Sequence, residues 1–253
     1  MLMSVAEIAR NAGMYPELAG ARVLVTGVQA TRGVDLVRAF GDHGCRMVLQ
    51  IPEISQEIDA LLGHVAQTAL DIHVHHDPID TAEDAVRFAQ SAAKYFGGFD
   101  IVVNLIAFDT GDLSSATSVG ELEDLIAERF QAAARTTGVA ANRMGLTWTH
   151  GSVLNILRIS EPRSDAEAAV AGLARAALQA LTRGEAAKWA DQSVRINGVA
   201  PRAVIGAKAL SVADDDCVRS EPDVAALALY LASQDGDSLT GLIFDAEGTA
   251  SAY

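Results

Sequence analysis

Arginine is the residue type that gives this chain its most conspicuous chemical potential. The sequence holds 16 arginines against 3 lysines, although its formal net charge is −14. A guanidinium group presents a planar fork of donors that can bind a carboxylate or a phosphate through two hydrogen bonds at once. The positions of the arginines in the fold therefore matter more for function than the net charge does.

Histidine and serine offer two other kinds of chemistry. His73 and His75 alternate along one expected strand and would share a face of it, next to His76 and Asp77. No further cluster of ligands accompanies them, so we expect no metal site. A hydrolase is also disfavoured, because the sequence has neither a nucleophile elbow nor an ordered Ser-His-Asp triad.

Apolar runs of strand length and of helix length alternate along the chain and must position these side chains. The alternation predicts the α/β class, with a Rossmann-type, doubly wound parallel sheet in three αβα layers. Ligands of such sheets bind at the carboxyl ends of the strands. The expected strands are 22–25, 47–51, 69–74, 100–106, 153–159, 194–199 and 242–245, and the expected helices are 34–40, 54–65, 82–96, 122–142, 167–190 and 223–232.

Length and composition indicate one domain. Half of the 253 residues are hydrophobic, which allows a large core. We expect a short N-terminal extension at 1–17 and a single α/β domain at 18–253. The acidic charge argues against a nucleic-acid partner, which requires a basic surface.

The cellular setting is expected to be the cytoplasm. Cys45 and Cys217 have no paired or metal-like spacing, which favours a reducing compartment. The first residues lack the apolar core of a signal peptide. No apolar run is long enough to span a bilayer, so we expect no membrane partner.

Five sequence blocks carry a family resemblance. They begin at Leu18 (LAGARVLVTG), Phe96 (FGGFDIVVN), Ala176 (AALQALTR), Arg195 (RINGVAP) and Thr240 (TGLIFDAEG). Together they resemble the short-chain dehydrogenase/reductase family, and they stand in the family's order from about residue 18 to residue 250. The resemblance implies the fold described above and a site for NAD or NADP.

The expected cofactor site is altered. The family's glycine-rich turn corresponds to TGVQATRG at 26–33, in which Thr31 replaces the middle glycine and should crowd a phosphate. Leu105-Ile106 also departs from the family's pattern, and Ile51 at the end of the second strand does not indicate NAD or NADP. The resemblance assigns cofactor contacts to Thr26, Gly27, Gly33, Asp77 and Asn104. Alternatively, the two glycines are kept for folding alone.

The family's catalytic residues are replaced. The resemblance places its Asn, Ser, Tyr and Lys at Arg129, Arg158, Ala171 and Arg175. The family's tyrosine donates or accepts the proton, and its lysine lowers the pKa of that tyrosine. Ala171 has no acid–base group, and Arg175 has no phenol to tune. We therefore predict no ordinary ketone or alcohol turnover.

The replacements suggest an anion site. By the resemblance, Arg129, Arg158, Arg175 and Arg202 should face one cleft, with Arg32 at its rim. Four guanidinium groups in one cleft would suit a phosphate, a carboxylate or an acidic peptide. The alternative is that each arginine pairs with a local acid and fills the space of a lost cofactor.

Two classes of function remain open. The first is a catalytically degenerate short-chain dehydrogenase/reductase: a ligand-binding, regulatory or partner subunit, with a small anion or an active paralogue as partner. The second is an NAD(P)-dependent oxidoreductase that acts on a carbonyl or an alcohol through a non-standard site. In either case, the resemblance implies a dimer or homotetramer built through helices 122–142 and 167–190, with 239–248 completing the tetramer.

Overall fold

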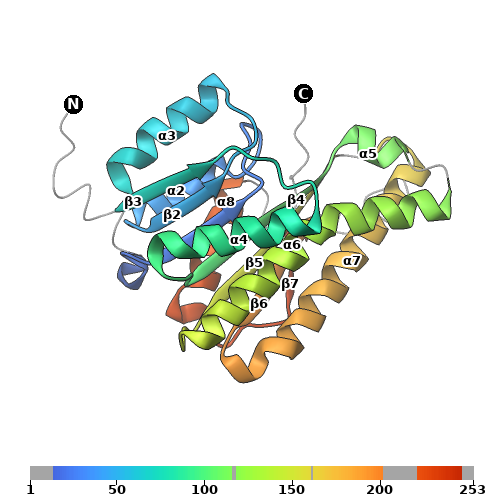
Figure 1. The fold of residues 1–253 in the computed structure, drawn as a ribbon. Helices are drawn as coiled ribbons and strands as arrows, with labels where there is room; N and C mark the ends of the chain where they lie inside the picture. Colours follow the sequence, from blue (N-terminus) through green and yellow to red (C-terminus); the bar gives the residue numbers. More distant parts are fainter. Residues whose placement is uncertain (1–13, 116–117, 161, 202–220, 247–253) are drawn as a thin grey trace.

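The fold is a single parallel sheet with helices on both faces (Figure 1). The computed structural model describes residues 14–115, 118–160, 162–201 and 221–246. Seven strands form the sheet in the order β3-β2-β1-β4-β5-β6-β7, and all neighbours are parallel. The strands are β1 (Arg22–Thr26), β2 (Arg46–Gln50), β3 (Asp71–His75), β4 (Ile101–Phe108), β5 (Ser152–Ile159), β6 (Arg195–Pro201) and β7 (Ile243–Ala246).

The helices complete three layers and confirm the predicted Rossmann-type architecture. In Figure 1, α4, α6 and α7 lie in front of the sheet, while α2 and α8 lie behind it. The helices are α2 (Val34–Asp42), α3 (Gln56–Thr68), α4 (Ala82–Phe96), α5 (Thr110–Ser115), α6 (Val119–Leu146), α7 (Asp165–Trp189) and α8 (Glu221–Ala232). Three short 3-10 turns lie at Pro16–Leu18, Ala190–Gln192 and Gln234–Gly236.

Local sequence explains where the long helices begin and end. Ser118 starts α6 with a reciprocal capping box, in which its side chain accepts from the Glu121 N–H and the Glu121 carboxylate accepts from the Ser118 N–H. Helix α4 has the same arrangement at Thr81 and Asp84, and it ends at Gly97, which takes the left-handed conformation with φ of 77°. These helices cover one face of the sheet, and the pocket described below opens at the carboxyl edge of that sheet.

The core follows the alternation of side chains along the strands. Val23, Val25 and Leu49 point toward α2, α3 and α8, whereas Leu24 and Val48 point toward α4 and α6. The apolar runs read in the sequence are therefore strands that are buried on both faces. In the described part of the chain, no helix is both long and apolar enough to cross a bilayer.

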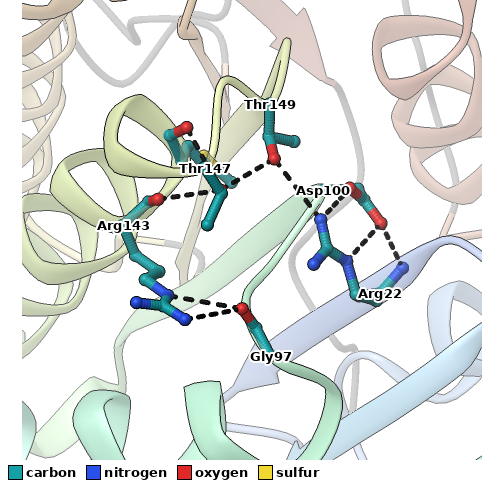
Figure 2. A network of polar contacts seen from close by, with 7 residues as sticks. Arg22, Gly97, Asp100, Arg143, Thr147 and Thr149 are labelled. Atoms are coloured by element: carbon teal, nitrogen blue, oxygen red, sulfur yellow. Dashed lines mark hydrogen bonds and ion pairs between the residues drawn. The ribbon is translucent and has the colours of Figure 1, made fainter.

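The amino-terminal edge of the sheet is held by a polar network (Figure 2). The backbone N–H, Nε and Nη2 of Arg22 donate to the Asp100 carboxylate over 2.8, 2.9 and 2.6 Å. Arg143 of α6 donates to the Gly97 carbonyl from Nη2 over 3.0 Å and from Nε over 3.3 Å. These contacts tie β1, β4 and the ends of α4 and α6 together.

Two predictions about organisation remain predictions. Residues just before position 18 already contact the domain, because Tyr15 is buried in the core and the Glu17 carboxylate accepts from the Gln234 N–H. Tyr15 and Glu17 thus contact the domain from the amino-terminal side of the division expected at 17/18, which stays a prediction. The second prediction is the assembly of several copies of the chain through 122–142, 167–190 and 239–248. It stays a prediction, because the structure contains one chain.

Candidate functional site

A pocket of about 710 Å³ opens at the carboxyl edge of the sheet. Its walls come from the ends of β1, β2, β4 and β5, from the turn that precedes α4, and from α5 and α6. This is the place where parallel α/β sheets bind ligands, since the strand order reverses direction between β1 and β4. The sheet topology therefore brings together residues as distant in sequence as Thr26 and Ser160.

The glycine turn after β1 is shaped by Leu105 of β4. Gly27 has φ of 76°, and a Cβ built there would lie 2.6 Å from the Leu105 carbonyl oxygen. Gly33 has φ of 81°, and its Cβ would overlap the end of the Leu105 side chain. Both positions require glycine for backbone conformation and for close approach. The fold alone therefore explains why these two glycines are present.

Gln50, at the end of β2, joins the same turn to the segment that follows β3. Its Oε1 accepts from the Gly27 N–H over 2.7 Å, and its Nε2 donates to the Asp77 carbonyl over 3.1 Å. Gln50 is buried. One backbone donor of the glycine turn is thus already used within the protein.

Three arginines converge on the pocket. Arg32 comes from the glycine turn, Arg129 from α6 and Arg158 from β5. Burial lowers the pKa of Arg32, and the positive charges of Arg158 and Arg129 lower it further, while Glu53 and Asp109 act in the opposite direction. Arg158 and Arg129 are therefore close enough to Arg32 for their charges to repel its own.

Each of these arginines also has a partner in the protein. Arg32 donates from Nε to the Gly27 carbonyl over 2.9 Å, and Arg158 donates from Nη1 to the Thr31 carbonyl. Arg129 forms an ion pair with Asp112 of α5. Burial lowers the pKa of Arg129, but the hydrogen bond and charge of Asp112 outweigh this, and the pKa is raised overall.

Carboxylates also line the pocket, so its charge is mixed. Asp112 has a side chain only 11% exposed, and it is held in a reciprocal pair of backbone-to-carboxylate bonds with Asp109. Among the described lining residues there are five acidic side chains against three arginines. The acidic residues are Glu53, Asp80, Asp109, Asp112 and Glu128. The pocket thus offers both strong donors and strong acceptors.

A protein-family model described as enoyl-(acyl carrier protein) reductase matches residues 27–248. The chain belongs to the short-chain dehydrogenase/reductase family. It is 29% identical to an uncharacterized oxidoreductase of Mycobacterium tuberculosis, over 89% of this chain and 90% of that protein. It is 25% identical to 3beta-hydroxysteroid dehydrogenase 1 of Eggerthella lenta, over 95% of this chain and 97% of that protein.

Solved structures of the family share the fold. A short-chain type dehydrogenase/reductase from Mycobacterium marinum superposes with a TM-score of 0.72 at 18% identity, covering 99% of this chain and 100% of that one. An enoyl-(acyl carrier protein) reductase from Anaplasma phagocytophilum, solved in complex with NAD, gives 0.65 at 20% identity, covering 90% and 92%. The Rossmann-type fold predicted from the sequence is thereby confirmed.

The four residues that the sequence resemblance assigns to the family's catalytic positions lie in two places in this structure. Arg129 and Arg158 line the pocket. Arg175 of α7 instead forms an ion pair with Asp245 of β7 and donates to the Pro201 carbonyl over 2.6 Å. Ala171 packs against the apolar cluster beneath α7. Neither of these two lies among the described residues that line the pocket.

The four-arginine cleft expected from the sequence is therefore not what the described residues form. Arg175 satisfies the alternative expectation, in which a local acid pairs with the arginine. Arg202 lies outside the described residues. The structure brings Arg129 and Arg158 together and adds Arg32, which the sequence had placed only at the rim.

The residues expected to contact a cofactor also fall into two groups, those that line the pocket and those that do not. Thr26, Gly27 and Asn104 line the pocket, whereas Gly33 and Asp77 are not among its described lining residues. Asn104 is buried and fully engaged: its Nδ2 donates to Thr137 and Asn155, and its Oδ1 accepts from the Thr26 hydroxyl. Its polar groups join three elements of the core.

The histidines of β3 have aromatic partners. His73 stacks on Tyr95 of α4, with ring centroids 4.0 Å apart, and His75 meets Phe88 edge-on at 5.1 Å. Within the described residues, no group of three His, Cys, Asp or Glu side chains is placed to hold a metal ion. These rings pack the outer strand of the sheet against α4.

Sequence reasoning missed Gln50, Asp112 and Leu105 as determinants of the site. Gln50 was detectable as the polar side chain that directly follows the apolar run Met47-Val48-Leu49 of the strand RMVLQ. Asp112 lies on a six-residue helix whose sequence has no hydrophobic periodicity from which a helix could be predicted. Leu105 was noted as a departure from the family's pattern, but its contact with two glycines depends on the pairing of β1 with β4.

Proposed function

We propose that this short-chain dehydrogenase/reductase is a ligand-binding member of its family, which holds a small anion in the pocket and does not interconvert a carbonyl and an alcohol in the usual way. The observation that carries the proposal is the convergence of Arg32, Arg129 and Arg158 on one pocket. An anion bound there would offset the repulsion that Arg158 and Arg129 exert on Arg32.

The proposal has a second support in the family's catalytic positions. By the sequence resemblance, the proton-transfer tyrosine falls at Ala171, which has no titratable group. Arg175, at the position of the lysine, is bound to Asp245 and to the Pro201 carbonyl. With these partners, Arg175 stabilises the contact between α7 and the β6–β7 edge of the sheet.

The fold implies NAD or NADP, and the residues at the glycine turn fit the dinucleotide poorly. The Gly27 N–H, a donor of that turn, already bonds to Gln50. The Thr31 carbonyl is bonded by Arg158, whose side chain therefore lies against the turn. A smaller anion requires fewer of these groups, so it agrees better with the geometry.

A binding titration tests the proposal. The intact protein would be titrated by calorimetry with NAD+, NADH, NADP+, NADPH, phosphate, pyrophosphate and citrate. We expect an anion of this panel to bind, and Arg32→Ala to weaken that binding. Arg38→Ala serves as the matched control, because Arg38 is an exposed arginine on the next helix, α2, and pairs with Asp35 of that helix. If no anion and no dinucleotide bound, the proposal would be wrong.

The second candidate is an NAD(P)-dependent oxidoreductase with a non-standard site. It is favoured by the match of an enzyme family's model to residues 27–248 and by the oxidoreductase names of the relatives. Turnover of a ketone or alcohol with NAD(P)(H) would establish it. Loss of that turnover in Arg175→Ala, with the fold retained, would assign the reaction to the family's lysine position and would overturn the first proposal.

A further inference from the structure

We infer that Arg158 sets the length of the ligand: it closes the cleft beside the glycine turn, so that the pocket takes an anion about the size of a mononucleotide and rejects a dinucleotide. This inference rests on the proposed function, because it concerns which anion that same pocket accepts. It goes further in naming one side chain that determines the choice.

The geometry of Arg158 carries the inference. The residue lies near the end of β5, and its guanidinium donates to the carbonyl of Thr31 in the turn that follows β1. Strand β4 lies between β5 and β1 in the sheet. The side chain therefore crosses above the end of β4, at the point where the strand order reverses. A dinucleotide bound to such a sheet extends across this point.

The shape of the pocket agrees with a closed cleft. The described lining residues extend from Pro52 and Pro78 on one side to Arg158, Ile159 and Ser160 on the other. None of the described lining residues belongs to α7 or β6, which stand on the far side of β5. The pocket thus ends where Arg158 stands, and the half that would face Ala171 is not part of it.

The remaining space suits a nucleoside phosphate. Arg32 within the glycine turn and Arg158 beside it supply donors for phosphate oxygens. Pro52, Pro78 and Ile79 give an apolar wall, and the carboxylates of Glu53 and Asp80 on the same side can accept from ligand hydroxyl or amino groups. The mixed charge of the pocket is explained by a ligand that carries both an anion and hydrogen-bond donors.

A series of ligands of increasing length tests the inference without any mutation. ADP, ADP-ribose and NAD+ share the same adenosine diphosphate part and differ in what extends from it. We expect the intact protein to bind ADP at least roughly ten-fold more tightly than NAD+, with ADP-ribose between them. Equal affinity for the three ligands would overturn the inference and leave the proposed function standing. Binding of none of them, nor of simple anions, would overturn both.

Arg158→Ala tests the residue itself. We expect the ratio of the NAD+ to the ADP dissociation constant to fall about ten-fold in this variant, because the barrier is removed while the phosphate contacts of Arg32 remain. Arg46→Ala is the control: it removes the same charge from an exposed position at the amino end of β2 and should leave the ratio unchanged. A ratio that stays the same in Arg158→Ala would contradict the inference even if both ligands bind.

Discussion

The two edges of the sheet use arginine in opposite ways. At the amino edge, Arg22 directs three donors at one carboxylate, and its hydrogen bond to Asp100 raises its pKa (Figure 2). At the carboxyl edge, Arg32 is half-buried beside two other arginines, and burial together with their charges lowers its pKa. The same side chain is thus stabilised by its surroundings at one edge and destabilised at the other.

This difference separates a structural arginine from a candidate ligand-binding one. A guanidinium whose donors are matched by protein acceptors has little left to offer a ligand. A guanidinium that faces like charges is more stable when an anion arrives, so it contributes to binding rather than to folding. Asp112 shows that the carboxyl edge is not uniform, since it pairs with Arg129.

The largest expected effect tests whether the carboxyl edge also serves the fold. Gly27→Ala should lower the free energy of unfolding by roughly 3 kcal/mol or more, because the new Cβ meets a backbone oxygen and the residue has positive φ. Gly33→Ala should cost less, because its Cβ meets the flexible end of Leu105. Chemical denaturation would measure both. Equal costs would show that Leu105 cannot move.

The next effect tests the amino edge. Asp100→Ala leaves three Arg22 donors without their acceptor and should cost about 2 kcal/mol of stability. Ligand affinity should not change, since the pocket lies at the other edge. Thermal melts and the anion titration would be run on the same sample. If the binding free energy changed by more than the free energy of unfolding, Asp100 would act on the pocket, and the distinction between the two edges would be wrong.

Arg32→Ala is expected to lower ligand affinity and to leave stability nearly unchanged, which is the reverse of the effect expected for Asp100→Ala. Phosphate affinity should fall about ten-fold, while unfolding free energy in phosphate-free buffer should shift by no more than about 0.5 kcal/mol. The lost hydrogen bond to the Gly27 carbonyl is offset by relief of repulsion with Arg158 and Arg129. Adding phosphate should raise the melting temperature of the unaltered protein more than that of the variant. Equal rises would show that phosphate acts elsewhere.

The smallest effect is expected at Arg46, an exposed residue at the amino end of β2. Arg46→Ala should change stability by less than about 0.5 kcal/mol, because surface substitutions without buried partners rarely do more. Anion affinity should be unchanged within error. Reduced affinity here would mean that the overall charge of the protein, rather than the three pocket arginines, governs binding.

The fold was predictable because it depends on a local property. Apolar runs of strand length alternate with helical runs, and every expected strand and helix is present with ends shifted by a few residues. The helix predicted at 82–96 has those limits in the structure, since Thr81 and Gly97 cap it. The short helix α5 was not predicted because it has one turn and a half and no hydrophobic period.

The site was only partly predictable because it depends on distant pairings. The resemblance indicated Arg129, Arg158, Arg175 and Arg202 as one group, yet Arg175 is paired with a residue 70 positions away. Likewise, Arg158 reaches Thr31 across 127 positions. No local pattern encodes such contacts, because they arise only when the strands are in register.

Leu105 has a consequence for how this sequence can change. Any substitution that shortens Leu105 would free the space beside Gly33 but not beside Gly27, which faces a main-chain oxygen. Gly33 would then keep only the constraint of its positive φ, whereas Gly27 would keep both its positive φ and its steric constraint whatever the pocket holds. The packing therefore determines the order in which these positions can accept substitutions. A glycine pattern of this kind can persist in a sequence whether or not a dinucleotide is bound.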